Sequence, residues 1–291
     1  MPTIPKVYPI KNVRLGELPV KTIVPITAKT ETQALEQARI LAHHADVDIV
    51  EFRIDLLEIA QDIVSNNPKI MALGEQLNEI LQKPLIATIR TANEGGNLTI
   101  TDNDYATVYQ QYLAKPFMQL LDIEMFRAPS IVENLVKRAH DNNVLVIMSN
   151  HDFAKTPPQA TIEQRLLTQD SLRADILKIA VMPTNKADVF TLMNATLAVS
   201  QQTDKPLITM SMGQLGVISR VATASVGGSM SFGMVGQASA PGQIEVSELK
   251  RLLNSVKPYP VVSDFWYMDL GFKKSIVIEI VPASFKSNCV K

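Results

Sequence analysis

Cysteine is almost absent from this chain, which has one among 291 residues, Cys289 near the C-terminus. A single thiol forms no internal disulfide, thiolate zinc site or cysteine-based catalytic pair within the body of the chain. Long apolar runs are missing too, because no stretch reaches the roughly 18 residues that a membrane helix needs. The N-terminal segment 1–11 lacks the apolar core of a secretory signal. We therefore expect a cytoplasmic protein with no membrane partner.

An excess of charge of one sign is also lacking, since 28 basic and 29 acidic residues leave a formal net charge of −1. The chain has no basic run with interleaved aromatic residues, so we expect no nucleic-acid partner. The hydrophobic content of 46% is enough for a large core. A chain of this length suits one large α/β domain or two small ones.

Short apolar runs alternate with longer segments of helical periodicity, which is typical of a parallel sheet covered by helices. The predicted strands are 22–27, 48–53, 85–90, 117–124, 144–150, 176–181, 206–211 and a weak one around 229–235. The predicted helices include 31–44, 131–142, 161–172, 186–202 and 246–255. This order predicts an α/β fold, a (β/α)₈ TIM barrel forming a single catalytic domain over residues 1–256. A doubly wound open sheet is the alternative, although no G-x-G-x-x-G follows the first strand.

Two segments flank the predicted barrel. Residues 13–20 precede the first strand and are expected to form a short hairpin that closes the bottom of the barrel. Residues 257–291 form an atypical C-terminal tail that contains Trp266, Cys289 and a strand-like run at 275–281. An exposed apolar run of this kind favours self-association. The sequence assigns the tail no role.

Lys178 interrupts the apolar run 175–183, where a buried strand should carry no charge. Burial in an apolar wall disfavours the ammonium form and populates a neutral amine, which can attack a carbonyl carbon. This reading makes Lys178 a Schiff-base lysine. In the alternative, its stem lies along the strand while its head reaches water or pairs with a carboxylate.

Polar side chains gather where the predicted strands end, which is where barrel enzymes place their catalytic groups. In chain order they are Glu51, Arg53, Arg90, Glu94, Asp122, Glu124, His151, Lys178, Ser211 and Arg220. His151 suits a proton shuttle because the ordinary pKa of histidine is about 6.5. Glu94 could orient the imidazole or hold it protonated. The other histidines, His43, His44 and His140, end predicted helices and are expected at the surface.

The arginines suggest an anionic substrate. Guanidinium groups at Arg53, Arg90 and Arg220 can bind a carboxylate or phosphate through two parallel hydrogen bonds. The alternative is that they pair with Glu51, Glu94 or Glu124 and hold the barrel mouth together. After Arg220, residues 221–243 carry no charge and are rich in small side chains. This segment is expected to contain the last strand and a lid, from which Ser239 and Gln243 donate to substrate hydroxyls; a linker or barrel seam is the alternative.

Five short segments resemble, in residues and in order, the motifs of type I 3-dehydroquinate dehydratases. They are Glu51-Phe52-Arg53-Ile54-Asp55, Thr88-Ile89-Arg90-Thr91-Ala92-Asn93-Glu94-Gly95-Gly96, Met148-Ser149-Asn150-His151-Asp152-Phe153, Lys178-Ile179-Ala180-Val181-Met182-Pro183 and Ala238-Ser239-Ala240-Pro241-Gly242-Gln243. The likeness covers residues 13–255. It implies a (β/α)₈ barrel, usually dimeric, that converts 3-dehydroquinate into 3-dehydroshikimate without a metal or nucleotide cofactor. This reaction belongs to the shikimate pathway of aromatic amino acid biosynthesis.

The resemblance also implies residue roles. Lys178 condenses with the C3 ketone, and His151 takes the C2 proton and then protonates the departing C1 hydroxyl, while Glu94 positions the imidazole. Arg220 binds the substrate carboxylate. The ring hydroxyls and the surrounding charges are held by Glu51, Arg53, Arg90, Ser239 and Gln243. One departure is Pro25, which stands where some family members have a substrate-contacting serine.

Two other functions are open from the residues alone. A class I aldolase acting on phosphorylated sugars would also use a Schiff-base lysine, and it would need a phosphate cradle of exposed N–H groups, faintly allowed by 226–229. A non-catalytic barrel that binds a hydroxy acid would be indifferent to the loss of Lys178.

Overall fold

The computed structural model describes residues 6–256 and centres on an eight-stranded parallel sheet in the order β10-β3-β4-β5-β6-β7-β8-β9. Its strands are β3 (Lys21–Ile26), β4 (Ile49–Arg53), β5 (Leu85–Thr88), β6 (Leu120–Glu124), β7 (Leu145–Asp152), β8 (Ile176–Val181), β9 (Leu207–Ser211) and β10 (Met230–Phe232). β9 and β10 meet at a bridge between Leu207 and Gly228, where the Ser229 N–H donates to the Leu207 carbonyl at 2.9 Å. The expected (β/α)₈ barrel is therefore confirmed. The tail prediction for 257–291 lies outside the described residues.

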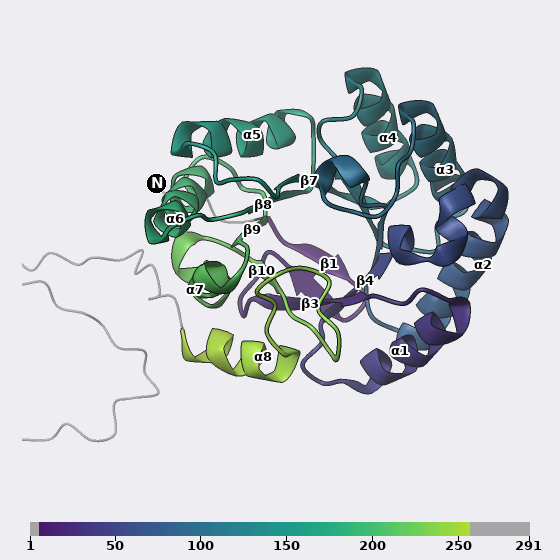
Figure 1. Cartoon of the computed structure of the whole chain (residues 1–291), viewed down its shortest axis with the longest axis horizontal. Coiled ribbons are helices and arrows are strands. Elements are labelled where there is room, and N and C mark those ends of the chain that lie inside the picture. The colour runs from purple at the N-terminus through teal and green to yellow at the C-terminus, as the bar shows by residue number, and fades with distance from the viewer. Residues whose placement is uncertain (1–5, 257–291) are drawn as a thin grey trace, which may run out of the picture. The chain divides into compact units, whose positions relative to one another are not determined.

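Helices surround the strands in the view along the barrel (Figure 1). They are α1 (Glu31–His43), α2 (Ile63–Leu81), α3 (Asp102–Ala114), α4 (Pro129–Asp141), α5 (Gln159–Ser171), α6 (Lys186–Ser200), α7 (Val217–Val221) and α8 (Val246–Ser255). Side-chain caps start several of them, since Thr30, Thr101 and Asn185 each accept a hydrogen bond from the first turn. Pro68 lies inside α2 without ending it.

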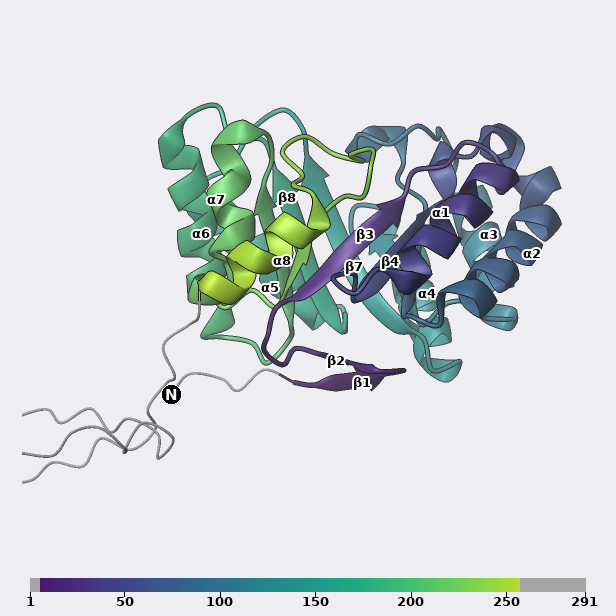
Figure 2. The ribbon, with the colours of Figure 1, turned by 90° about the horizontal axis from the view of Figure 1, so that it is seen from below.

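Some predicted boundaries are wrong. The hairpin consists of β1 (Tyr8–Ile10) and β2 (Val13–Leu15), so it begins before the expected 13–20. Figure 2 shows it below the barrel, at the end where the strands start. Strand β7 runs on to Asp152 because its ladder with β8 continues to that residue, and His151 therefore lies within a strand. The last strand is shorter than the expected 229–235.

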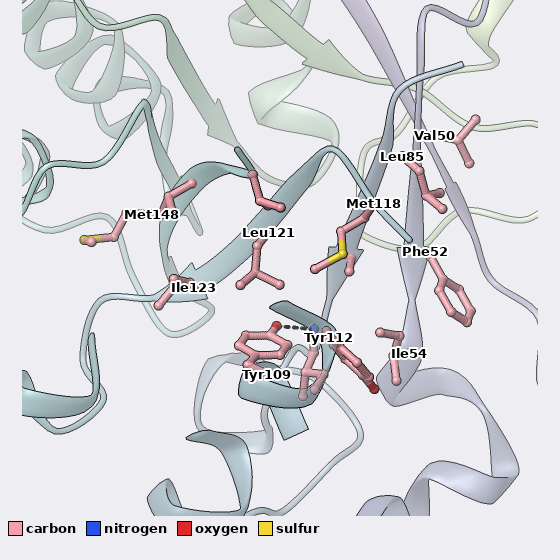
Figure 3. Packing of buried hydrophobic residues seen from close by; sticks show 14 of the residues in the cluster. Val50, Phe52, Ile54, Leu85, Tyr109, Tyr112, Met118, Leu121, Ile123 and Met148 are labelled. Atoms are coloured by element: carbon pink, nitrogen blue, oxygen red, sulfur yellow. Dashed lines mark hydrogen bonds between the residues drawn. The ribbon is translucent and has the colours of Figure 1, made fainter. Parts of the chain in front are cut away.

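The barrel interior is apolar near the strand starts. One buried cluster joins Ile23, Ile49, Ile86, Leu120, Ile147, Ile176, Ile208 and Met230 from the eight strands to Tyr8, Val13 and Leu15 of the hairpin. The hairpin thus plugs this end of the barrel. A second cluster fills the space between strands and helices, where Tyr109 and Tyr112 of α3 lie near Leu121 and Ile54 (Figure 3). Alternate residues of β3 to β9 supply the two clusters, whereas β10 contributes only to the first.

Candidate active site

Lys178 lies on β8 with its side chain inside the barrel, and the residue is 3% exposed. Its Nζ donates to Asp122 Oδ2 at 2.8 Å and lies 3.7 Å from Glu51 Oε1. Its remaining neighbour is apolar, because Nζ lies 4.7 Å from the centroid of the Phe232 ring. The ammonium therefore pairs with a carboxylate inside the barrel and does not reach bulk water.

Arg90 follows β5 and ties the surrounding groups together. Its NH2 donates to Asp122 Oδ1 at 2.7 Å, and its NH1 donates to Glu124 Oε1 at 2.9 Å and to Ser149 Oγ at 3.0 Å. The same NH1 lies 3.4 Å from Glu94 Oε2. The expected pairing of an arginine with Glu94 and Glu124 is thus present here. Four groups, from β6, β7 and the segment that follows β5, share one guanidinium.

His151 on β7 contacts Glu94, which lies in the 3₁₀ helix η3 (Ala92–Glu94). Nδ1 of the imidazole lies 2.8 Å from Glu94 Oε2, and the His151 backbone N–H donates to the same oxygen at 3.0 Å. Asn150 Nδ2 donates to Glu94 Oε1 at 3.3 Å. These contacts hold the ring through Nδ1 and do not involve its other nitrogen, Nε2.

The electrostatics of this pair favour a neutral imidazole. Burial, together with the positive charges of Arg90 and Lys178, holds the pKa of His151 well below its usual range. Burial raises the pKa of Glu94 to about 8, although Arg90 acts in the opposite sense. The two groups titrate as a unit that keeps one proton between them at neutral pH. An orienting role for Glu94 fits these shifts, and a permanently protonated His151 does not.

Arg53 and Arg220 have different surroundings. Arg53 forms a two-point ion pair with Asp55, in which both N···O distances are 2.8 Å. Arg220, at the end of α7, is 1% exposed and has no acidic partner among residues 6–256. Its Nε has no hydrogen-bond partner in that range, while NH2 donates to the Pro241 carbonyl at 3.1 Å. Burial lowers the pKa of Arg220 to about 10. A buried, unpaired guanidinium is a strong attractor for an anion.

The loop 233–245, between β10 and α8, lies over the mouth of the barrel (Figures 1 and 2). Its base is held because Met234 N–H donates to the Ile244 carbonyl and Val246 N–H to the Met234 carbonyl, each at 2.9 Å. Farther along, the Pro241 carbonyl also accepts the Gly213 N–H at 3.1 Å. We refer to residues 233–245 as the lid.

Two lid side chains face the same space as the groups on the strands. Ser239 and Gln243 bond each other, with Gln243 Nε2 donating to Ser239 Oγ at 3.0 Å. One cavity, with about 490 Å³ of empty space partly open to solvent, is lined by Glu51, Arg53, Arg90, Glu94, His151, Lys178, Ser239 and Gln243. Met210, Met212 and Phe232 supply an apolar wall. Of the nine residues to which the resemblance gives roles, all except Arg220 therefore line this cavity.

Comparison with known proteins shows what this constellation belongs to. A family model described as type I 3-dehydroquinase matches residues 22–260. The chain belongs to the type I 3-dehydroquinase family. It is 62% identical over 261 residues to the catabolic 3-dehydroquinate dehydratase of Acinetobacter baylyi, covering 89% of this chain and 94% of that protein. The expected family and enzyme class are confirmed.

Other members of the type I 3-dehydroquinase family agree. The 3-dehydroquinate dehydratase of Listeria innocua is 42% identical over 84% of this chain and 96% of its own length. The crystal structure of the Clostridium difficile type I 3-dehydroquinate dehydratase, with covalently modified comenic acid, matches with a TM-score of 0.81. That match has 35% identity and covers 87% of this chain and 98% of the other.

Several site residues of this family member were not predicted from its sequence. Asp55 anchors Arg53, Ser149 bonds Arg90 and Asp122, and Phe232 flanks Lys178. Asp55 stands in a quoted motif, but only the fold shows its partner. Within residues 6–256, no group of three or more histidine, cysteine or acidic side chains is arranged to hold a metal ion. No helix in that part of the chain is long and apolar enough to span a membrane.

Proposed function

We propose that this chain dehydrates 3-dehydroquinate to 3-dehydroshikimate and water through a Schiff base on Lys178. The observation that carries the proposal is the placing of Lys178 Nζ and the His151 ring on one cavity, beneath a lid and among arginines. Family membership and the names of the relatives from Acinetobacter baylyi and Listeria innocua support the substrate.

The reaction begins at Lys178. Its ammonium gives up one proton and the resulting amine adds to the C3 ketone. That proton returns to the carbinolamine hydroxyl, which leaves as water, so the product is an iminium ion that carries one N–H proton and one positive charge. The iminium group withdraws electrons and makes the C2 proton acidic. Removal of that proton moves the C2–H electron pair toward nitrogen and gives a neutral enamine. Collapse of the enamine expels the C1 hydroxyl and restores the iminium ion, which water hydrolyses to release the product.

His151 moves the proton. Its Nε2 takes the C2 proton and returns it to the departing C1 hydroxyl, which leaves as water, so the imidazole ends in its starting form. The lowered pKa of His151 supports this use because it keeps the ring neutral before the step, and the ring becomes an effective base once Glu94 is ionised. Glu94, 2.8 Å from Nδ1, orients the ring.

Arg220 binds the substrate carboxylate in this proposal. It is buried, lacks an acidic partner among residues 6–256, and contacts the lid through the Pro241 carbonyl. Ser239 and Gln243 add hydrogen bonds from the lid. The ring hydroxyls meet Glu51, Arg53 and Arg90, although Asp55 already occupies Arg53 and four groups share Arg90.

The aldolase alternative finds little support. A phosphate cradle needs free backbone N–H groups, but those of Gly227, Gly228 and Ser229 donate to the carbonyls of Ala224, Thr223 and Leu207. A purely binding barrel would have no use for a lysine beside a neutral histidine.

Borohydride trapping tests the proposal. Treating the enzyme with 3-dehydroquinate and borohydride should add one reduced adduct to the peptide that contains Lys178, and Lys178→Ala should abolish both adduct and turnover. The absence of an adduct in the wild type, or full turnover in the variant, would refute the Schiff-base mechanism.

We further propose that the enzyme acts as a cytoplasmic homodimer in the shikimate pathway, supplying aromatic amino acid biosynthesis. Light scattering on the purified protein measures the oligomeric state, and a monomer would refute the dimer. Gene deletion should cause a requirement for aromatic amino acids. Unchanged growth without them would point to catabolic use, as in the name of the Acinetobacter baylyi relative.

A further inference from the structure

Asp122 is the acidic side chain nearest to the reacting nitrogen, yet it does not line the cavity. Its Oδ2 lies 2.8 Å from Lys178 Nζ, whereas Glu51 Oε1 lies 3.7 Å away and also accepts from Thr88 Oγ1 at 3.0 Å. Asp122 is 0% exposed. Glu51 lines the cavity that Asp122 does not reach. Asp122 therefore contacts the nitrogen from outside the cavity in which the substrate would bind.

The carboxylate is fixed in that position. Its other oxygen, Oδ1, accepts from Arg90 NH2 at 2.7 Å and from Ser149 Oγ at 2.6 Å. Its backbone carbonyl accepts the hydroxyl of Tyr109 from α3 at 2.8 Å. With Oδ1 occupied on two sides, Oδ2 remains for Nζ alone.

We propose that Asp122 is a further catalytic residue, the counter-ion that keeps the imine nitrogen on Lys178 protonated until His151 removes the C2 proton. This inference rests on the proposed function. The iminium nitrogen keeps one N–H, and that proton can occupy the place of the ammonium proton that bonds Oδ2 in the free enzyme. A neutral imine would be a much weaker electron sink, so the counter-ion determines how much of the adduct is reactive.

The surroundings keep Asp122 ionised. Burial alone would raise the pKa of this carboxyl, but Arg90 and Lys178 outweigh burial and hold the pKa well below its usual range. The charged and titratable groups around it are Glu51 from β4, Arg90 and Glu94 after β5, Glu124 from β6, His151 from β7, Lys178 from β8, and Tyr105 and Tyr109 from α3. We therefore expect Asp122 to stay ionised beside the iminium ion at neutral pH.

The consequence is a pair of opposite effects. The Asp122 charge stabilises the ammonium form of Lys178 and so slows the first attack, but it stabilises the iminium form afterwards. Asp122→Asn should leave adduct formation intact or faster while slowing C2 proton removal. A residue that only supported the fold would lower both steps together.

Two hydride donors separate these steps. Borohydride reduces both neutral imines and iminium ions, whereas cyanoborohydride reduces only the iminium ion efficiently. With 3-dehydroquinate at about pH 8, Asp122→Asn should keep the borohydride adduct on Lys178 but lose cyanoborohydride adduct by about tenfold. Its turnover should fall on the order of 100-fold. Ser149→Ala is the matched control, since it removes a hydrogen bond to Oδ1 but keeps the charge, and its ratio of the two adducts should equal that of the wild type.

Equal cyanoborohydride labelling of wild type and Asp122→Asn would overturn the inference while leaving the Schiff-base mechanism standing. Absence of any wild-type adduct would overturn both. If Asp122→Asn does not fold, the pH dependence of the two adducts in the wild type tests the inference instead. A fixed counter-ion predicts a constant ratio of the two adducts up to about pH 9, and a fall of that ratio near about pH 7 would refute it.

Discussion

The two ends of this barrel hold opposite chemistry on the same strands. On β8, Ile176 lies in the apolar cluster next to the hairpin, and Lys178 lies in the cavity, with exposures of 0% and 3%. Both side chains point inward because they are two residues apart. A step of about 6.6 Å along a strand therefore separates a residue of the apolar cluster from the proposed Schiff-base lysine.

Two histidine–carboxylate pairs show the same contrast. At the lower end, His140 Nε2 lies 2.9 Å from Asp175 Oδ2, which also accepts the Val146 N–H. At the upper end, His151 Nδ1 lies 2.8 Å from Glu94 Oε2 and its ring lines the cavity. The distances are nearly equal. What differs is where the second ring nitrogen can act, because only His151 borders the cavity.

The largest expected effect exploits that contrast. His151→Ala should lower kcat by about 10²–10⁴-fold, because the proton shuttle is lost, while borohydride still traps the adduct on Lys178. His140→Ala is the matched control and should leave kcat unchanged. Steady-state kinetics and peptide mass spectrometry measure both. Wild-type turnover in His151→Ala would remove this residue from the mechanism.

Substitutions in the apolar cluster at the lower end of the barrel should change stability and not turnover. Ile176→Ala removes a fully buried side chain from the cluster beneath Lys178 and should reduce the free energy of unfolding by about 2–5 kcal/mol. The kcat of the folded protein should stay near the wild-type value. Urea unfolding followed by kinetics at low denaturant tests the separation. A large loss of kcat without loss of stability would mean that the two ends are not independent.

The pair of His151 and Glu94 should also set the pH dependence of kcat/KM. Burial raises the pKa of Glu94 to about 8, so the pair keeps its shared proton below that pH and His151 is a poor base there. We expect kcat/KM to rise about tenfold per pH unit up to about pH 8. In Glu94→Gln the rise should move to lower pH, because burial, Arg90 and Lys178 hold the pKa of His151 well below its usual range.

pH-rate profiles of the two proteins measure this shift. The groups that face Glu94 are Arg90, which opposes the raised pKa, and Glu124 and Asp122, which add to it. Identical profiles for wild type and Glu94→Gln would show that the rise of kcat/KM with pH reports the titration of another group.

The smallest expected effect concerns the lid. Gly242 has φ +77°, and a Cβ there would lie 2.3 Å from the Gly213 carbonyl oxygen. Gly242→Ala should therefore prevent the lid from packing against Gly213 and Arg220. Loss of the hydrogen bonds to Pro241, about 1 kcal/mol each, should raise KM by about five- to thirtyfold. Gly236 has φ +74° but open space around it, which makes Gly236→Ala a control for backbone strain alone. Equal KM values for the two variants would argue against docking through Pro241.

Much of the fold could be predicted because apolar, β-branched runs alternate with helical segments, and this alternation is local. The exact ends of the strands are harder to predict from the sequence. The predicted hairpin begins too late because Pro9 interrupts its first strand, and the predicted β7 ends too early because polar residues such as Asn150 and Asp152 still pair with β8. Both boundaries depend on hydrogen bonding between neighbouring strands, which the sequence does not show.

The site followed a similar rule. Lys178 and His151 were found because each stands out from its own strand. Partners were not found, since the pairings of Arg53 with Asp55 and of Asp122 with Arg90 depend on side-chain direction and strand register. Arg220 was assigned from its glycine-rich surroundings, but its burial without an acidic partner among residues 6–256 became visible only in the fold.

Arg90 has a consequence for how this protein can change over evolutionary time. Because one guanidinium serves Asp122, Glu124, Ser149 and Glu94, a substitution at any of the three acidic residues alters the charge balance around the other two. Effects at such coupled positions do not add. A lineage that replaces one of them must therefore adjust the rest in concert, while Ile176 and its apolar neighbours at the other end can vary singly among residues of similar volume.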